Sequence, residues 1–156
     1  MLAKSIITYY KENNRILLLT ESITAGGIAQ RLAEVPGASE VLWGSLVLYQ
    51  AAAKSQILQI NNALLSPDRI ASQETVIAMA QATIHLYHKN QEEKQKNYSS
   101  LSISGFADGS QAGVVSCALI TENNIHAVTW NLSGTRNEIQ QTSIHLALEL
   151  LALPLQ

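Results

Sequence analysis

A short apolar run, followed by a small polar segment and then an amphipathic helix, constrains the fold most. Residues 16–20 read Ile-Leu-Leu-Leu-Thr, and residues 22–27 are small or polar apart from Ile23. Apolar residues then recur at helical spacing as far as Pro36-Gly37. A continuous apolar run of this length is typical of a strand buried on both faces, as in a parallel sheet covered by helices. The pattern therefore favours a strand–turn–helix unit of an α/β fold.

The rest of the chain continues this alternation and then ends in a hairpin and a helix. We expect helices over 2–13, 28–35, 51–58, about 70–95 (begun by Ser66-Pro67-Asp68) and 136–152, and strands over 16–20, 41–49, 101–105, 114–120 and 125–132. Early alternation followed by a strand hairpin is typical of helices packed on both faces of a mixed sheet. The prediction is one domain, residues 1–156, folded as a three-layer α/β/α sandwich.

Composition excludes several classes of protein. Apolar residues make up 47% of the chain and charged residues 14%, which argues against disorder. The net charge of −2 argues against nucleic-acid binding. No apolar run is long enough to span a membrane, and the N-terminal segment lacks the apolar core of a signal peptide. We therefore expect a soluble, cytoplasmic protein without a membrane partner.

Cysteine and histidine give no indication of a metal site. Cys117 is the single cysteine, so an internal disulfide or a cysteine-rich zinc site is excluded, and its place within a strand predicts a small buried side chain. The four histidines, at positions 85, 88, 126 and 145, do not show metal-ligand spacing with acidic partners. We expect no bound metal.

The first candidate for chemistry is the segment from Ser22 to Gly27. It follows a buried strand and opens a helix, which is where ligands bind in open α/β sheets. Unpaired N–H groups at a helix N-terminus suit a phosphate or an oxyanion, and Gly26 and Gly27 allow close approach to the backbone. The alternative is ordinary helix capping by Ser22 or Thr24.

The second candidate is Lys54, which follows Tyr49 at the end of the second predicted strand. If the first two strands are parallel, Lys54 reaches the region of Ser22. A Ser–Lys pair is a known route to an activated nucleophile, because a buried lysine titrates low enough to act as a base. Tyr49 would relay a proton or orient the lysine. The alternative is a surface lysine and a core tyrosine.

Two further segments lie at predicted element ends. Ser104-Gly105 ends a strand and would border the same cleft, unless it is a plain strand-to-strand loop. Arg136 opens the last helix, where the helix dipole disfavours a positive charge, so a function such as holding a phosphate is expected.

The candidate segments, taken together in their order and spacing along the chain, resemble those of the CinA C-terminal domain family, whose members include nicotinamide mononucleotide (NMN) deamidases. The resemblance covers nearly the whole chain and rests on these segments: Glu21-Ser22-x-Thr24 with glycine after it, Pro36-Gly37-Ala38-Ser39, Gly44-x-x-x-x-Tyr49 with Lys54, Ser72, Ser104-Gly105 and Gly134-x-Arg136. It implies an α/β/α fold and hydrolysis of the carboxamide of NMN to nicotinate mononucleotide and ammonia, without a metal or cofactor.

The resemblance also implies roles for individual residues. Ser22 would be the nucleophile, Lys54 its general base and Tyr49 their helper. Substrate binding would fall to Ser104, Gly105 and Arg136, and oxyanion stabilisation to Thr24, Gly26 and nearby N–H groups.

The chain departs from the family pattern mainly around the substrate. Ile23 replaces a cysteine, Ala25 replaces the first glycine of a Gly-Gly pair, and Gln50-Ala51 replaces Ser-Asn. The 106–112 loop is shorter and lacks a proline and a basic residue, and Gln140-Gln141 stands where a second basic residue is usual. The alternative to an amidohydrolase is a catalytically degenerate member that binds nucleotides or proteins.

High apolar content also predicts a homo-oligomer, because apolar surface left over after one core is built would be buried between subunits. Trp43 and Trp130 are expected in packing or at a subunit interface.

Overall fold

The computed structural model describes residues 1–89, 91 and 97–155. Five main helices are described: α1 (Leu2–Glu12), α2 (Gly27–Ala33), α3 (Ala51–Leu58), α4 (Gln73–His88) and α5 (Arg136–Leu151). Five strands accompany them: β1 (Ile16–Glu21), β2 (Leu42–Val47), β3 (Tyr98–Gly105), β4 (Val114–Thr121) and β5 (Ile125–Asn131). Short 3-10 turns cover Ala38–Glu40, Asn62–Leu64 and Leu153–Leu155.

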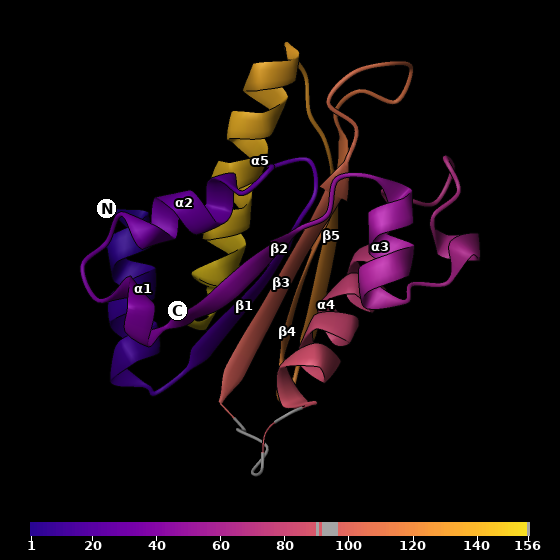
Figure 1. Ribbon diagram of the computed structural model, residues 1–156. Coiled ribbons are helices and arrows are strands. Elements are labelled where there is room, and N and C mark those ends of the chain that lie inside the picture. The colour runs from indigo at the N-terminus through magenta and orange to yellow at the C-terminus, as the bar shows by residue number, and fades with distance from the viewer. Residues whose placement is uncertain (90, 92–96, 156) are drawn as a thin grey trace.

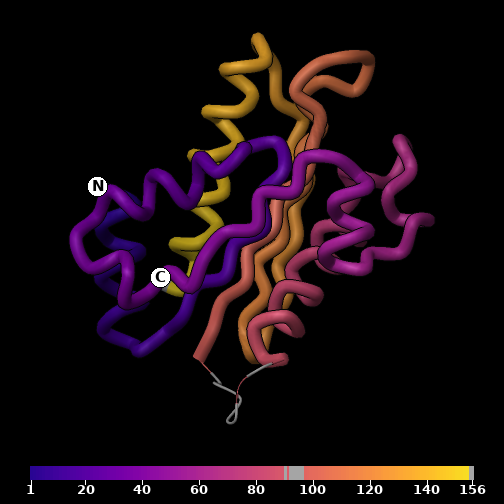
Figure 2. The backbone as a smooth tube through the Cα atoms, viewed as in Figure 1, coloured from indigo at the N-terminus to yellow at the C-terminus, as the bar shows by residue number. Residues whose placement is uncertain are grey.

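The strands form one mixed sheet in the order β2-β1-β3-β4-β5. β1 pairs in parallel with β2 and β3, whereas β4 pairs antiparallel with β3 and β5. Helices α1, α2 and α5 cover one face, and α3 and α4 cover the other (Figures 1 and 2). The three-layer α/β/α sandwich with a mixed sheet is therefore confirmed, and the first two strands are parallel.

Two apolar cores lie on either side of the sheet. The larger joins α1, α2 and α5 to the sheet and includes Tyr10, Leu19, Leu101 and Ile144. The smaller lies under α3 and α4, around Leu58, Val76 and Met79. Cys117 is fully buried within β4, as predicted, and burial raises the pKa of its thiol.

The fourth helix differs from its prediction at both ends. It begins at Gln73 rather than near residue 70, because Ser72 caps it by accepting a hydrogen bond from the Thr75 N–H at 3.2 Å. Ser66-Pro67-Asp68 forms a turn, in which Arg69 and Ile70 N–H groups donate to the Ser66 carbonyl. The helix ends at His88, short of the predicted 95; residues 90 and 92–96 lie outside the described part of the chain.

No helix among the described residues is both long and apolar enough to cross a lipid bilayer. Trp43 is 44% exposed on edge strand β2 and packs edge-on against Tyr87, with ring centroids 5.4 Å apart. Trp130 is half-buried on the opposite edge strand and packs against the larger core.

Candidate active site

Ser22 and Lys54 meet at the carboxyl ends of the two parallel strands. Residues Glu21 and Val47 are neighbours in the register of β1 and β2, and the Leu48 N–H donates to the Glu21 carbonyl at 2.9 Å. Ser22 and Tyr49 therefore leave the sheet side by side. From α3, the Lys54 ammonium donates to the Ser22 hydroxyl at 3.0 Å and to the Tyr49 carbonyl at 3.3 Å.

The environment of Lys54 makes it a usable base. Its side chain is 1% exposed, and this burial lowers its pKa from 10.5 to about 8. The cause is desolvation of the ammonium, which favours the neutral amine. With a pKa of about 8, roughly a tenth of the molecules carry the neutral amine at pH 7. Since the amine then accepts from the Ser22 hydroxyl, the pair is arranged to generate a nucleophilic oxygen.

Glu21 holds the turn that carries Ser22. Its carboxylate is fully buried and accepts four hydrogen bonds, with two to each oxygen. The donors are the Thr24 hydroxyl (2.7 Å), the Ile28 N–H (3.0 Å), the Ala29 N–H (3.0 Å) and the Ser45 hydroxyl (2.9 Å). A negative charge at the start of α2 also complements the helix dipole. Glu21 thus ties β1, β2 and α2 together immediately beside the candidate nucleophile.

The turn after Ser22 takes a left-handed backbone at two successive residues. Ala25 has φ of +50° and Gly26 has φ of +93°. Glycine adopts this region freely, whereas alanine does so at a cost. The next residue, Gly27, begins α2, and a Cβ atom there would lie 2.3 Å from the Ile144 Cδ1 atom of α5. The two glycines therefore allow the sharp turn and the close contact between α2 and α5.

Gln140, on α5, supports the same turn. Its side-chain amide donates to the Ile23 carbonyl at 3.0 Å. The neighbouring Gln141 accepts from Arg31 at 2.8 Å. The two glutamines at the site of the usual basic residue therefore bind protein groups beside the turn.

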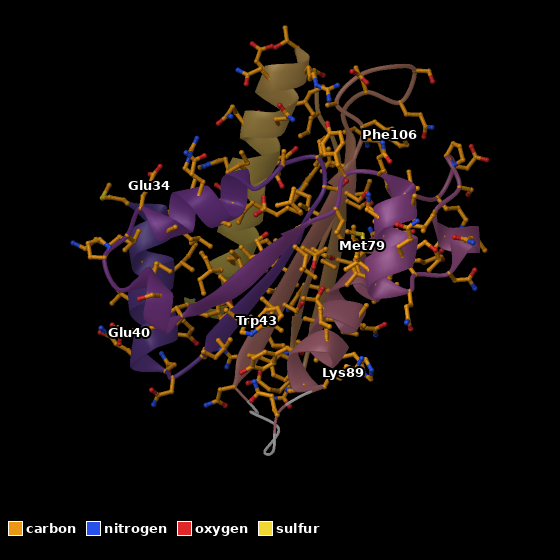
Figure 3. The ribbon with its side chains drawn as sticks, in the orientation of Figure 1. Glu34, Glu40, Trp43, Met79, Lys89 and Phe106 are labelled. Atoms are coloured by element: carbon orange, nitrogen blue, oxygen red, sulfur yellow. The ribbon has the colours of Figure 1, made fainter. Side chains whose placement is uncertain are left out.

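A pocket of about 160 Å³ opens over Ser22. Its lining comes from the Ser22 turn, Tyr49, the segment after β3 and the start of α5: Ser22, Ile23, Tyr49, Gly105, Phe106, Ala107, Asp108 and Arg136. Figure 3 labels Phe106 at this end of the sheet, near the first turn of α5. The Arg136 guanidinium donates to the Tyr49 hydroxyl at 2.5 Å and forms an ion pair with Asp108. The predicted residues Ser22, Tyr49, Gly105 and Arg136 therefore border one pocket, and Lys54 is hydrogen-bonded to Ser22 in its lining.

The hydroxyl groups of two predicted site residues make hydrogen bonds away from the pocket over Ser22. The Ser104 hydroxyl is buried and donates to the Ile70 carbonyl at 2.8 Å, on the α4 side of the sheet. The Thr24 hydroxyl donates to Glu21, so Thr24 contacts the carboxylate that holds the turn. These two residues and the predicted Gly26 lie outside the lining of the pocket over Ser22. The Tyr49 hydroxyl points to Arg136, and its carbonyl is the group that contacts Lys54.

Sequence reasoning assigned no role to Glu21, Asp108 or Gln140. Glu21 had a recognisable signal, because a charged residue that ends an otherwise apolar strand must be paired when buried. Asp108 and Gln140 gave no such signal, since their contacts with Arg136 and Ile23 span 28 and 117 residues of sequence.

Comparison with known proteins gives a consistent family assignment. The family model described as "CinA C-terminal domain" matches residues 1–155. A CinA-like protein of Fervidobacterium nodosum is 32% identical over 146 residues, and one of Thermotoga neapolitana is 30% identical over 146 residues. These matches cover 90% and 92% of this chain but 34% and 35% of the two relatives. The chain thus spans about a third of their length.

Solved structures show the same fold. The competence/damage inducible protein CihA from Agrobacterium tumefaciens superposes with a TM-score of 0.87 and 25% identity, covering 99% of this chain and 94% of that one. A competence or damage-inducible protein from Enterobacter asburiae gives a TM-score of 0.83 and 26% identity, covering 97% and 94%. On the family match and these relatives together, the chain belongs to the CinA C-terminal domain family.

Proposed function

We propose that this protein is an amidohydrolase that uses a Ser–Lys pair on a nicotinamide mononucleotide-like carboxamide. The observation that carries the proposal is the 3.0 Å contact between the buried Lys54 ammonium and the Ser22 hydroxyl, together with the lowered pKa of Lys54. A buried lysine with no acidic partner among the described residues is costly, and placing it against a serine at a strand end is best explained by catalysis. The pyridine carboxamide comes from the resemblance to NMN deamidases.

The reaction proceeds in two balanced steps. Neutral Lys54 takes the proton from the Ser22 hydroxyl as its oxygen attacks the carboxamide carbon. The Lys54 ammonium then gives that proton to the leaving nitrogen, so that ammonia departs and an ester to Ser22 remains. Water, deprotonated by Lys54, attacks the ester, and that proton passes from Lys54 to the Ser22 oxygen as the carboxylic acid leaves; the acid then gives its own proton to the released ammonia and becomes the carboxylate.

The size of the pocket supports a substrate that enters with its carboxamide end only. At about 160 Å³, the pocket is smaller than the roughly 300–1,000 Å³ usual for a site that encloses a whole small ligand. The pyridine carboxamide would enter toward Ser22, and the rest of the substrate would extend past Tyr49 and Arg136.

The direct test is ammonia release from NMN by the wild-type protein, the Ser22→Ala variant and the Lys54→Met variant. We expect each variant to lose at least about 10³-fold in kcat/KM, because nucleophile and base act as a unit. Turnover retained in Ser22→Ala would refute the mechanism. Nucleotide binding without turnover in the wild type would instead favour the degenerate, binding-only member of the family.

The pH dependence gives a second test. Only the neutral form of Lys54 accepts the serine proton, so kcat/KM should rise with pH and level off above about 8, following the lowered pKa of Lys54. A plateau already reached at pH 6 would contradict a role for Lys54 as the base.

We also propose that the protein self-associates. Edge strand β2 exposes Trp43 and Val47, which are 44% and 47% accessible. Exposed apolar side chains on a strand at the edge of a sheet favour contact with another chain. Light scattering that shows a strict monomer at micromolar concentration would refute this.

A further inference from the structure

The pocket mouth contains a carboxylate where an anionic substrate would need positive charge. Arg136 is the basic residue of the pocket lining, and one of its terminal nitrogens is paired with Asp108. The other terminal nitrogen donates to the Tyr49 hydroxyl at 2.5 Å. Each terminal nitrogen of Arg136 therefore already binds a protein group, and one of those groups is a carboxylate that an incoming phosphate would have to displace.

The loop that carries Asp108 is held at both ends by backbone hydrogen bonds. The Phe106 N–H donates to the Val114 carbonyl at 3.0 Å, and the Gly113 N–H donates back to the Phe106 carbonyl at 2.8 Å. Gly113 has φ of +89°, and a Cβ atom there would lie 1.8 Å from the Leu132 carbonyl oxygen. These contacts anchor both ends of the loop (Figure 1), and the Asp108 carboxylate within it pairs with Arg136.

The start of α5 carries a second carboxylate. Glu138 accepts from the Thr135 N–H at 2.7 Å and from the Thr135 hydroxyl at 2.8 Å, completing a capping box. Hydrogen bonds from Thr135 lower the pKa of this carboxyl. Of these two carboxylates, Asp108 lines the pocket and pairs with Arg136, whereas Glu138 contacts Thr135.

From this arrangement we propose that Asp108 is a specificity-determining residue, which selects a pyridine carboxamide without a phosphate over the phosphorylated nucleotide. The inference rests on the proposed amidohydrolase function and names its substrate class. A phosphate dianion at the pocket entrance must displace Asp108 from Arg136 and then lie close to the displaced carboxylate. The dephosphorylated nucleoside, nicotinamide riboside, needs neither change.

The experiment compares NMN with nicotinamide riboside, which differ only by the phosphate. The ratio of kcat/KM values for the two is measured for the wild type, for Asp108→Asn and for Glu34→Gln. Glu34→Gln is the matched control, because it removes the same charge at the exposed C-terminal end of α2, well away from the pocket (Figure 3). Dissociation constants of both ligands, from calorimetry on the same proteins, give a readout that does not need turnover.

We expect the wild type to prefer the riboside. Asp108→Asn should shift the ratio of kcat/KM values and the ratio of dissociation constants toward NMN by about 3- to 10-fold. The shift is of this modest size because charges at an exposed site interact through a largely aqueous medium. The shift should shrink as salt is added. Glu34→Gln should leave both ratios within twofold of the wild type.

Distinct outcomes overturn the two proposals. A wild type that prefers NMN, or ratios that do not change in Asp108→Asn, would overturn the role of Asp108 while leaving the amidohydrolase intact. Failure to hydrolyse either compound would overturn the amidohydrolase. The binding ratios would then decide the role of Asp108 alone.

Discussion

Replacing Lys54 with methionine should stabilise the protein at neutral pH. The folded pKa of about 8 lies 2.5 below the ordinary value of 10.5, which corresponds to a cost of about 3 kcal/mol at pH 7. The variant also loses the contacts with Ser22 and the Tyr49 carbonyl, worth about 1 kcal/mol each. The expected net gain at pH 7 is therefore about 1 kcal/mol, or some 2–4 °C in Tm.

This advantage should reverse as the pH rises. Between pH 8 and 10.5 the folded protein binds fewer protons at Lys54 than the unfolded chain, so the wild type becomes more stable with increasing pH. Of the cost of about 3 kcal/mol that the charged Lys54 imposes on folding at pH 7, about 2.5 kcal/mol is removed when the pH is raised to 10. At pH 10 the variant should then be less stable than the wild type by about 1–2 kcal/mol.

Urea unfolding followed by far-UV circular dichroism at pH 7, 8.5 and 10 measures this difference. Lys4→Met, on an exposed position of α1, corrects for the general effect of removing a positive charge. A difference in unfolding free energy between Lys54→Met and the wild type that is the same at pH 7 and pH 10 would refute the desolvation argument. The proposed base would then lose its physical support.

Three further substitutions test the turn that carries Ser22, each by its free energy of unfolding in urea. Ala25→Gly should stabilise by about 0.5–1 kcal/mol, because φ is +50° there; destabilisation would contradict the strain. Gly27→Ala should destabilise by about 1–3 kcal/mol, and Ile144→Val, which removes the clashing Cδ1 atom, should recover part of that loss in the double variant. Glu21→Gln should cost more than about 2 kcal/mol, because an amide nitrogen would face donors where an oxygen now accepts. A loss below 0.5 kcal/mol would show that the buried carboxylate does not hold the turn.

Local patterns in the sequence were sufficient for the layers of the fold. The apolar run before Ser22 and the small residues after it belong to adjacent positions in the chain, so their meaning does not depend on distant contacts. The same holds for the final helix, predicted over 136–152 and observed over Arg136–Leu151. The start of α4 was misjudged because two capping sequences compete there. Ser66-Pro67-Asp68 has the composition of a helix start, but the Ser72 side chain caps the helix that forms.

The site was predictable only in part, because its contacts join distant segments. The pairing of Ser22 with Lys54 could be anticipated once the two strands were taken as parallel, since parallel strands end at the same edge of a sheet. The direction in which each side chain points could not be anticipated from the sequence. Tyr49 turns its hydroxyl to Arg136, and Ser104 turns its own to the opposite layer.

By itself, the sequence determined the element order, the strand-end position of Ser22 and the family resemblance, because each is recorded in neighbouring residues or fixed spacings. Only the tertiary structure decided that Lys54 is buried, that Glu21 accepts four hydrogen bonds and that Asp108 pairs with Arg136. Burial and charge pairing depend on which distant segments pack together. They therefore set the basicity of the lysine and the charge at the pocket mouth, which no local pattern encodes.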